Sequence, residues 1–341
     1  MSIIMKNKIT TAALVCIILF VTPSIFSQQQ KLAQTGMKFL SLPLDARASG
    51  FANAATSVED GAASLFYNPA GIARLENFSN VALGRVQYIA NINYNYGSIA
   101  IAPFQGNYGV IGVSFESVDY GDFMGTVRAD NEQGFVDVGS FSPTAFALGL
   151  GYAKALSEKF AVGGNVKYVH QSLGTSVVNV DASGNYLTEE NKTNVIAFDF
   201  GIIYKTGFKS LDFGMDIRNF SREVTYKKES FQLPLVFKIG ISMNILDLMP
   251  NINPDLHSFL LTAEASHPRD YPEQLSIGGE YTFMKLISLR VGYIAPTDVE
   301  GVSAGVGIKH SFSDFNFSLD YSFTSYQVFN NVHRISVSFA L

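Results

Sequence analysis

Residues after position 79 alternate between apolar and polar types with a period of two, and no apolar run of about 18 residues interrupts this pattern. The last segment is the clearest example, with Ile335 and Val337 on one face and Arg334 and Ser336 on the other. A period of two is the signature of β-strands. The pattern therefore excludes a bundle of transmembrane helices and leaves two fold classes, a soluble all-β protein and a membrane β-barrel.

The composition of the two strand faces distinguishes these classes. The apolar faces are large and aromatic, because the chain contains 28 Phe and 16 Tyr, while only 16% of its residues are charged. Soluble domains carry about 25% charged residues. The polar faces bear charges in mid-strand, at Lys167, Asp199, Asp212, Asp216, Arg218, Lys238, Glu264, Glu280, Arg290, Lys309 and Asp320. Aromatic faces toward lipid and charges toward a lumen explain both features. We predict an all-β fold, a membrane-spanning antiparallel β-barrel.

Strand length and number follow from the same pattern. About fourteen segments have the length of about ten residues that a tilted membrane strand needs. The predicted strands are 79–88, 93–103, 107–116, 143–153, 160–170, 193–204, 210–219, 232–243, 257–266, 274–283, 286–294, 301–310, 314–323 and 332–341. An even number of strands closes the sheet without free edges.

The connections between these strands support the count. Outer-membrane barrels have short periplasmic turns and longer outer loops. The connections after even-numbered strands are short, except for 244–256. The two longest connections, 117–142 and 171–192, both fall on the outer side and are rich in polar residues and glycine. We predict that these two segments are exposed outer loops.

The first 27 residues have the pattern of a cleaved secretory signal peptide. Lys6 and Lys8 form a basic region, residues 9–21 form an apolar region, and Ser27 offers a small residue for cleavage. The alternative is an uncleaved anchor. Cys16, the only cysteine, lies within the apolar region. Cleavage would leave a chain with no thiol for a disulfide, a nucleophile or a metal site.

Residues 28–78 do not alternate, and their sequence is rich in alanine and typical of short helices. The lumen of a barrel of about fourteen strands is wide enough to need filling. We therefore predict three parts: a signal peptide at 1–27, an N-terminal hatch or plug inside the barrel at 28–78, and the outer-membrane barrel at 79–341.

Motifs within this segment occur in a specific order. Phe39-Leu40, Ala46-Arg47-Ala48 and Gly50 come first, then Ala54, Ser57 and Asp60, and finally Asn68-Pro69-Ala70-Gly71. This order, ahead of a barrel, resembles the PorV/PorQ family of FadL-like outer-membrane proteins. The resemblance implies a hatch inside the barrel. Its structural or gating residues would be Arg47, Gly50, Asp60, Asn68, Pro69, Ala70 and Gly71.

The resemblance also implies a function in type IX protein secretion or surface attachment. Such a barrel would dock secreted proteins or the translocon through its outer loops. The implied partners are a type IX translocon, attachment-complex proteins, secreted proteins with a C-terminal signal domain, and outer-membrane lipid. The implied location is the outer membrane of a Gram-negative type bacterium. Independently, the alternating segment 332–341 resembles the signal that barrel assembly machinery recognises during insertion.

The alternative function is a FadL-like transporter of long-chain fatty acids or other hydrophobic small molecules. It requires an apolar pocket at the outer mouth, and the loop aromatics Phe123, Phe135, Phe141 and Tyr186 are candidate ligand-facing residues. A simple diffusion pore is disfavoured by the predicted plug. The charges expected in the lumen would neutralise one another, clamp the hatch, or merely form a solvated wall; the candidates are Asp212, Asp216, Arg218, Glu264, Glu280, Arg290 and Asp320.

Other kinds of chemistry find no support in the sequence. The five histidines show no metal-ligand spacing, and no nucleotide-binding or hydrolase motif occurs. We therefore predict no enzymatic activity, no cofactor and no metal. The 24 basic residues are outnumbered by 29 acidic ones and are scattered along the chain, which disfavours nucleic-acid binding.

Overall fold

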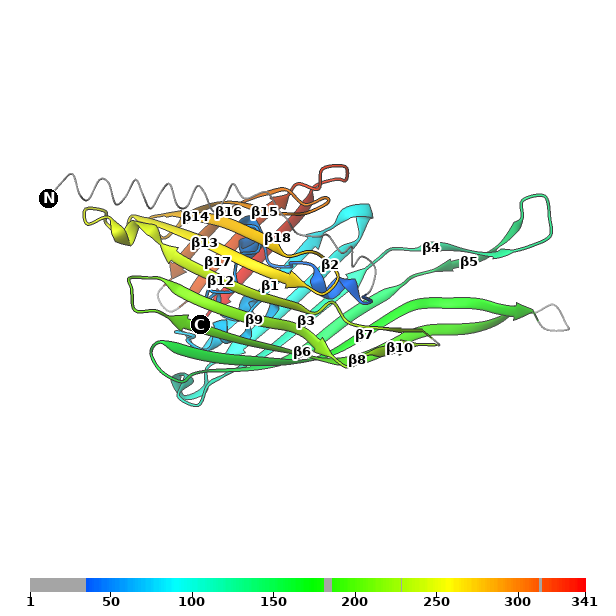
Figure 1. Ribbon diagram of the computed structural model, residues 1–341, viewed down its shortest axis with the longest axis horizontal. Helices are drawn as coiled ribbons and strands as arrows, with labels where there is room; N and C mark the ends of the chain where they lie inside the picture. Colours follow the sequence, from blue (N-terminus) through cyan, green and yellow to red (C-terminus); the bar gives the residue numbers. More distant parts are fainter. Residues whose placement is uncertain (1–34, 181–185, 228, 313–314) are drawn as a thin grey trace. The chain divides into compact units, whose positions relative to one another are not determined.

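The structure is a computed structural model that describes residues 35–180, 186–227, 229–312 and 315–341 (Figure 1). The predicted signal peptide with Cys16, and residues 28–34 of the predicted hatch, lie outside the described residues. Among the described residues, every helix is too short or too polar to cross a bilayer.

Fourteen of the described strands form one closed barrel in which all neighbours are antiparallel. The sheet closes where the first strand pairs with the last, for example Leu83 with Val337. The barrel strands are β1 (Ser79–Gln87), β2 (Asn93–Ile101), β3 (Val110–Asp119), β6 (Thr144–Ala155), β7 (Phe160–Val180), β8 (Tyr186–Lys205), β9 (Asp212–Ser221), β12 (Val236–Asn244), β13 (His257–Pro268), β14 (Gln274–Phe283), β15 (Ile287–Ala295), β16 (Val302–Phe312), β17 (Phe315–Thr324) and β18 (Val332–Ala340). The predicted fold class is confirmed.

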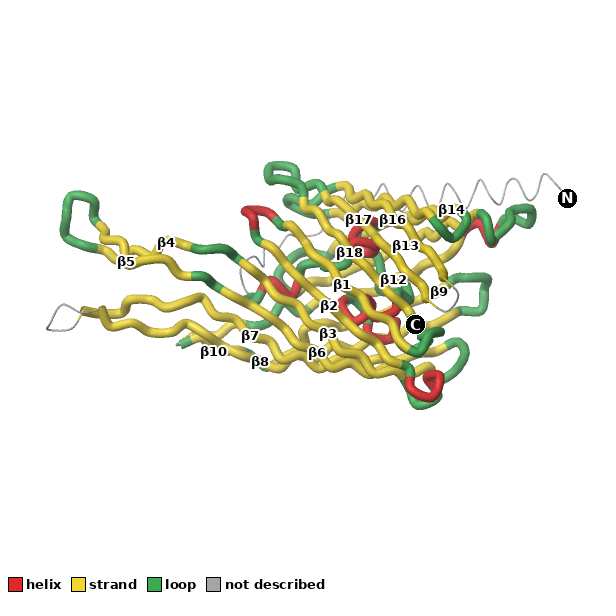
Figure 2. The backbone as a smooth tube through the Cα atoms, turned by 180° about the vertical axis from the view of Figure 1, so that it is seen from behind, coloured by secondary structure: helices red, strands yellow, loops and turns green. Residues whose placement is uncertain are grey.

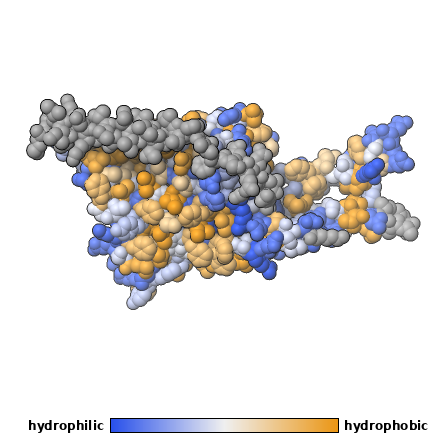
Figure 3. Space-filling model, in the orientation of Figure 1, coloured by the Kyte–Doolittle hydropathy of each residue, from blue (hydrophilic) through white to orange (hydrophobic). Residues whose placement is uncertain are grey.

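Alternation along each strand separates a lipid-compatible outer face from a polar inner face. In β15, Leu289 and Val291 are exposed on the outside, whereas Ser288 and Arg290 are buried toward the lumen. Apolar side chains accordingly gather on the barrel surface (Figure 3). The mid-strand charges are tolerated because they face inward, where hydrogen-bonding partners replace water.

The two ends of the barrel differ, and we name them the short-turn end and the hairpin end. The short-turn end carries the connections after β2, β6, β8, β12, β14 and β16, among them the short helices η5 (Pro103–Gly106) and η6 (Ile245–Leu248). The hairpin end carries η4 (Ile89–Asn91) and two additional hairpins, β4 (Phe123–Arg128) with β5 (Phe135–Phe141) and β10 (Val224–Tyr226) with β11 (Glu229–Phe231).

Segments 117–142 and 171–192 are largely exposed, as predicted, but most of their described residues form β-strands and not irregular loops. β4 and β5 occupy the first, and β7 and β8 extend well past the barrel in the second (Figures 1 and 2). The physical reason is local pairing: the segment from Thr175 to Val177 lies opposite Thr188–Glu190 in an antiparallel ladder, and its β-branched residues favour extended backbone. Polar composition alone concealed this ladder, because both faces of a protruding hairpin meet water.

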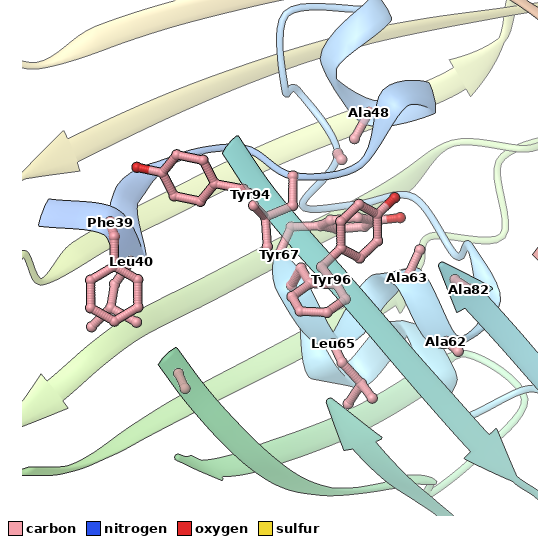
Figure 4. Close-up of a cluster of buried hydrophobic side chains, with 14 of the residues drawn as sticks. Phe39, Leu40, Ala48, Ala62, Ala63, Leu65, Tyr67, Ala82, Tyr94 and Tyr96 are labelled. Atoms are coloured by element: carbon pink, nitrogen blue, oxygen red, sulfur yellow. The ribbon is translucent and has the colours of Figure 1, made fainter. Parts of the chain in front are cut away.

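The described part of the N-terminal segment lies inside the ring of strands. Its helices are η1 (Lys38–Ser41), α2 (Ala46–Gly50), η2 (Gly61–Phe66) and η3 (Pro69–Ile72), which appear within the barrel in Figure 2. Leu40, Leu65 and Tyr67 of this segment pack with Tyr94 and Tyr96 of β2 in one hydrophobic cluster (Figure 4). The core of the molecule is therefore the interface between this segment and the inner barrel wall.

Candidate functional site

The interior segment begins at the hairpin end and finishes at the short-turn end. Thr35 pairs with Gln232, just before β12, and the Gly36 amide donates to the Gln232 carbonyl over 3.1 Å. The segment then leads into β1, which starts at Ser79 beside the end of β18. It thus crosses the barrel lengthwise.

Local sequence signals explain the short helices of the segment. Asp45 caps α2, because its carboxylate accepts the Ala48 amide at 2.9 Å. Asn68 caps η3 in the same way by accepting the Ala70 amide at 3.0 Å, and Pro69 occupies the first helical position. The Asn68 side-chain amide also donates to the Thr56 carbonyl at 2.6 Å and to the Ile202 carbonyl of β8 at 3.1 Å.

Close backbone contact joins the segment to the wall. A Cβ on Gly163 of β7 would lie 2.5 Å from the Ala70 nitrogen. The predicted motif glycines make similar approaches: a Cβ on Gly50 would meet the Arg290 side chain at 3.1 Å, and one on Gly71 would meet Ser64 at 2.5 Å. Gly163 and Gly71 have no space for a Cβ unless a neighbour moves, whereas Gly50 is only tightly packed, because a Cβ there needs the Arg290 side chain to shift by a few tenths of an ångström.

Replacing Gly163 by alanine is expected to destabilise the barrel by about 1–3 kcal/mol through overpacking against η3. Gly164 provides a matched control one residue away, because a Cβ there meets only ordinary contacts at 3.6 Å. Urea unfolding of both variants, followed by circular dichroism, checks the difference. Equal stability of Gly163→Ala and Gly164→Ala would contradict this packing.

An ion network connects the segment to three strands. Arg47 of α2 donates to both Glu280 oxygens at 2.9 and 2.7 Å, and its Nη1 lies 2.6 Å from Asp60. Arg290 lies 2.5 Å from Glu280 and 2.6 Å from Asp320. Bidentate pairs of this kind are geometrically specific. Two guanidinium groups and three carboxylates therefore hold α2 against β14, β15 and β17.

A second group of lumen charges lies on β9, β12 and β13. Glu264 of β13 accepts the Thr56 amide at 3.0 Å and pairs with Lys238 at 2.7 Å. Asp216 is buried beside them, and its carboxylate oxygens have no hydrogen-bond partner among the described residues. Asp212 stands at the start of β9, at the short-turn end, and forms no ion pair with another described residue.

A third polar cluster consists of Lys167, Asp199 and Asn219. None of these residues was a sequence candidate for contact with the segment. A register shift between Phe198 and Phe200 marks an irregularity in β8, at Asp199. Lys167 lies 2.8 Å from Asp199 and donates to the Asn219 side chain at 2.6 Å. Asn219 adopts φ 61°, a backbone region that asparagine tolerates. Mid-strand charge was a sequence signal for Lys167 and Asp199, whereas the irregularity could not be read from the alternation.

A cavity of about 290 Å³ lies between the segment and the wall, toward the hairpin end. Its lining is mixed: the apolar residues include Leu40, Leu44 and Ile294, and the charged ones include Lys38 and Arg218. Lys38 pairs with Asp270 at 2.6 Å, and Thr35 donates to the same carboxylate. Burial raises the pKa of Asp270, but these hydrogen bonds outweigh it and hold that pKa below its usual value.

The four loop aromatics lie on the hairpins. Phe123 of β4 and Phe141 of β5 stack with ring centroids 5.8 Å apart. Phe135 of β5 and Tyr186 of β8 are exposed. None of the four is among the residues that line the interior cavity, whereas Tyr186 lines a separate cleft between the two hairpins. Arg218 and Glu264 line this cavity and were among the predicted lumen charges, whereas Lys38 and Asp270 were missed because they meet only in the folded chain.

Several solved structures share this barrel architecture. The chain is similar to the Pseudomonas putida toluene transporter TodX, with TM-score 0.58 and 12% identity over 87% of this chain and 97% of that one. It is similar to the CymD monoaromatic hydrocarbon channel, with TM-score 0.55 and 14% identity over 87% and 96%. A Pseudomonas aeruginosa FadL homologue gives TM-score 0.54 and 12% identity over 87% and 98%. At these identities the likeness shows the fold alone. A search of curated proteins found no match.

A family model for the type IX secretion system membrane protein PorP/SprF matches residues 129–339, more than half of the chain. The match lies within the barrel part and does not include the motifs between Phe39 and Gly71. It supports the type IX setting that the sequence resemblance implied, with PorP/SprF in place of PorV/PorQ, and it indicates an outer-membrane location. The chain belongs to the PorP/SprF family of type IX secretion system membrane proteins.

Proposed function

We propose that this barrel is a closed, non-enzymatic docking protein that receives secreted proteins or the translocon at its hairpin end, which faces the cell surface. The observation that carries the proposal is the pair of protruding hairpins. β4–β5 and the extensions of β7 and β8 rise beyond the barrel and expose apolar side chains such as Met124, Val178 and Leu187. Exposed apolar surface of this kind favours a protein partner.

The filled lumen supports the same proposal. Residues 36–73 occupy the interior and connect through hydrogen bonds to β2, β8, β13 and β14, among other strands. We propose that residues 28–78 act as a plug, with Arg47, Asp60 and Asn68 fastening it to the wall. A plugged barrel suits a role in which a partner binds at the surface and does not pass through the lumen.

Shortening one hairpin tests the docking role. Replacing residues 122–142 by a short flexible linker is expected to lower the surface presentation of secreted proteins at least about tenfold, because a few kcal/mol of interface contacts are removed. The measurement is labelling of secreted proteins on intact cells. The matched control replaces residues 246–255 at the short-turn end and should leave presentation unchanged. Normal presentation after removal of the hairpin, in a barrel that still folds, would contradict the proposal.

The cavity favours a second candidate function, transport of hydrophobic small molecules. Arg218 lines the cavity together with apolar residues, and its Nε has no hydrogen-bond partner among the described side chains. A cation beside an apolar wall suits the carboxylate and tail of a fatty acid. Uptake of a radiolabelled long-chain fatty acid that depends on Arg218 and persists in the hairpin deletion would favour this function over docking.

A further inference from the structure

The interior cavity of about 290 Å³ is bounded by residues from opposite sides of the barrel. Arg218 of β9 and Asp45 of the interior segment both line it. Asp45 accepts the Tyr96 hydroxyl of β2 at 3.2 Å, and the adjacent Ala46 amide donates to Ser336 of β18 at 2.7 Å. Because β18 and β9 are seven strands apart in the closed ring of fourteen, Asp45 and Arg218 lie on opposite sides of the cavity.

Most other charges of the lining are already paired. Two ion pairs neutralise four of them: Lys38 with Asp270 at 2.6 Å, and Lys238 with Glu264 at 2.7 Å. Arg218 and Asp45 form no ion pair with a described residue. The lining therefore presents an unpaired cation on one side and an unpaired carboxylate on the other.

The carboxylates closest to Arg218 along the chain and across the lumen lie outside this cavity. Asp216 is two residues earlier on β9, and Glu116 shares a separate cavity of about 10 Å³ with Arg218. Neither residue lines the larger cavity or forms an ion pair with a described residue. The part of Arg218 that faces the larger cavity is thus available to a ligand.

The charge of Asp45 exceeds what its structural role requires. A helix cap needs a side-chain oxygen, which asparagine, serine and threonine also supply without a charge. Asp45 is only 5% exposed, and burying a carboxylate without a cation is costly. Residues that break the usual rules of folding in this way concentrate at functional sites. A positively charged ligand group beside Asp45 would remove the cost.

We infer that the cavity binds a zwitterion whose carboxylate pairs with Arg218 and whose ammonium pairs with Asp45. An apolar stretch between the two ends would lie against Leu44, Phe66 and Val236, which also line the cavity. A short apolar peptide with free ends has this chemistry. The inference goes beyond docking and rests on the second candidate function only in treating the cavity as a ligand site.

The connection between β15 and β16 supports the same ligand class. It lies at the hairpin end and contributes Asp298 and Glu300 to the lining. Tyr326 donates to Glu300, and neither carboxylate forms an ion pair with a described residue. These charges favour a ligand that carries an ammonium over one that carries only a carboxylate.

Binding of leucine peptides to the purified full chain in detergent tests the inference. The probes are dileucine and trileucine, each with free ends, with an acetylated amino end, or with an amidated carboxyl end. Isothermal titration calorimetry measures their affinities. At least one of the two free peptides is expected to bind. Blocking either of its ends should weaken binding about tenfold, because each block removes one charge-assisted pair.

Matched variants connect each end of the peptide to one residue. In Asp45→Asn, acetylation should no longer weaken binding, whereas amidation still should. In Arg218→Gln the pattern should be reversed. Asp255→Asn is the control, because Asp255 pairs with Lys285 in an exposed position away from the cavity lining and should bind peptides as the original chain does. Circular dichroism shows that each variant is folded.

The effect of acetylation should also depend on pH. Burial, and then repulsion by Asp60, raises the pKa of Asp45 to about 6, so at pH 5 the carboxylate is largely protonated and loses its attraction for an ammonium. Both peptide ends stay charged at pH 7 and pH 5, since their own pKa values are about 8 and about 3.5. The advantage of the free amino end should therefore shrink from pH 7 to pH 5. The charged and titratable groups that face Asp45 are Asp60, Asp320, Arg47, Tyr67 and Tyr96.

Two results would overturn the inference: no binding of either free peptide, or an effect of acetylation that is the same in Asp45→Asn as in the original chain. These results are separate from the fate of fatty-acid transport. If fatty-acid uptake depends on Arg218 while the peptides do not bind, transport stands and the zwitterion is rejected. If the peptides behave as expected while fatty-acid uptake is independent of Arg218, the zwitterion site stands and fatty-acid transport is rejected.

Discussion

Replacing Glu280 by leucine is expected to lower the free energy of unfolding of the barrel by about 3–5 kcal/mol, the usual cost of breaking a buried ion pair. Glu280 is shared by Arg47 of the interior segment and Arg290 of the wall, and its side chain is only 7% exposed. Leucine fills a similar volume but leaves both guanidinium groups without their common carboxylate.

Urea unfolding measured by circular dichroism checks this prediction, since the chain has no tryptophan to report by fluorescence. Asp255→Asn is the control, because Asp255 pairs with Lys285 in an exposed position and should contribute little. Ion conductance in a planar bilayer gives a second readout: if the network fastens the segment inside the lumen, the Glu280→Leu barrel conducts more than the original. Unchanged stability and conductance would show that the network does not hold the segment.

Asparagine in place of Asp45 is expected to stabilise the barrel at pH 8 by about 1–3 kcal/mol, because each unit of pKa shift corresponds to about 1.4 kcal/mol. Burial, and then repulsion by Asp60, raises the pKa of Asp45 from 3.8 to about 6. Asp45 is 5% exposed, so solvent screening is small. The neutral side chain of asparagine avoids the cost of burying the charge, and it still accepts the Ala48 amide as a helix cap. It gives up the second carboxylate oxygen, which accepts the Tyr96 hydroxyl at 3.2 Å.

The sign of the pH dependence follows from this raised pKa. The folded chain binds the Asp45 proton more tightly than the unfolded chain does. The stabilising contribution is therefore complete below pH 3.8 and is lost as the pH rises through about 6. The advantage of Asp45→Asn over the original chain should thus disappear between pH 6 and pH 4.

Unfolding curves at pH 8 and pH 4 measure this difference. Asp45→Ala is the informative companion, because alanine removes the charge and also the cap, which costs about 1 kcal/mol. An Asp45→Asn barrel that is less stable than the original at pH 8 would contradict the assignment. In that case the charged carboxylate stabilises the folded state through its contacts.

The barrel was predictable because the residues of each strand alternate between apolar side chains that face lipid and polar side chains that face the lumen. Alternation at Leu289, Arg290 and Val291 distinguishes lipid from lumen without any knowledge of neighbours. The number of strands could then be predicted because short connections follow the even-numbered strands. The hairpins were missed because a ladder in water imposes no apolar face, so Thr175 and Thr188 carry no burial signal.

Much less of the interior could be predicted. Glu280, Arg290 and Asp320 were expected in the lumen from their position in the alternation, yet nothing local indicates that Arg47 meets Glu280, 233 residues away. Lys38 and Asp270 face the same difficulty, since their contact depends on the path of the segment through the barrel. The cap residue Asp45 was readable in principle, because an acidic residue directly before an alanine-rich helix is a common starting signal.

The lengthwise course of the interior segment has a consequence for assembly. The segment is continuous with β1, and β1 forms the closing seam with β18, the last strand of the chain. A finished cylinder could admit the segment only by threading it from one mouth to the other past the ion network. This obstacle does not arise if the segment packs against the partly formed sheet before β1 pairs with β18. In this order of assembly, the strands fold around the interior segment, and pairing of β1 with β18 closes the barrel last.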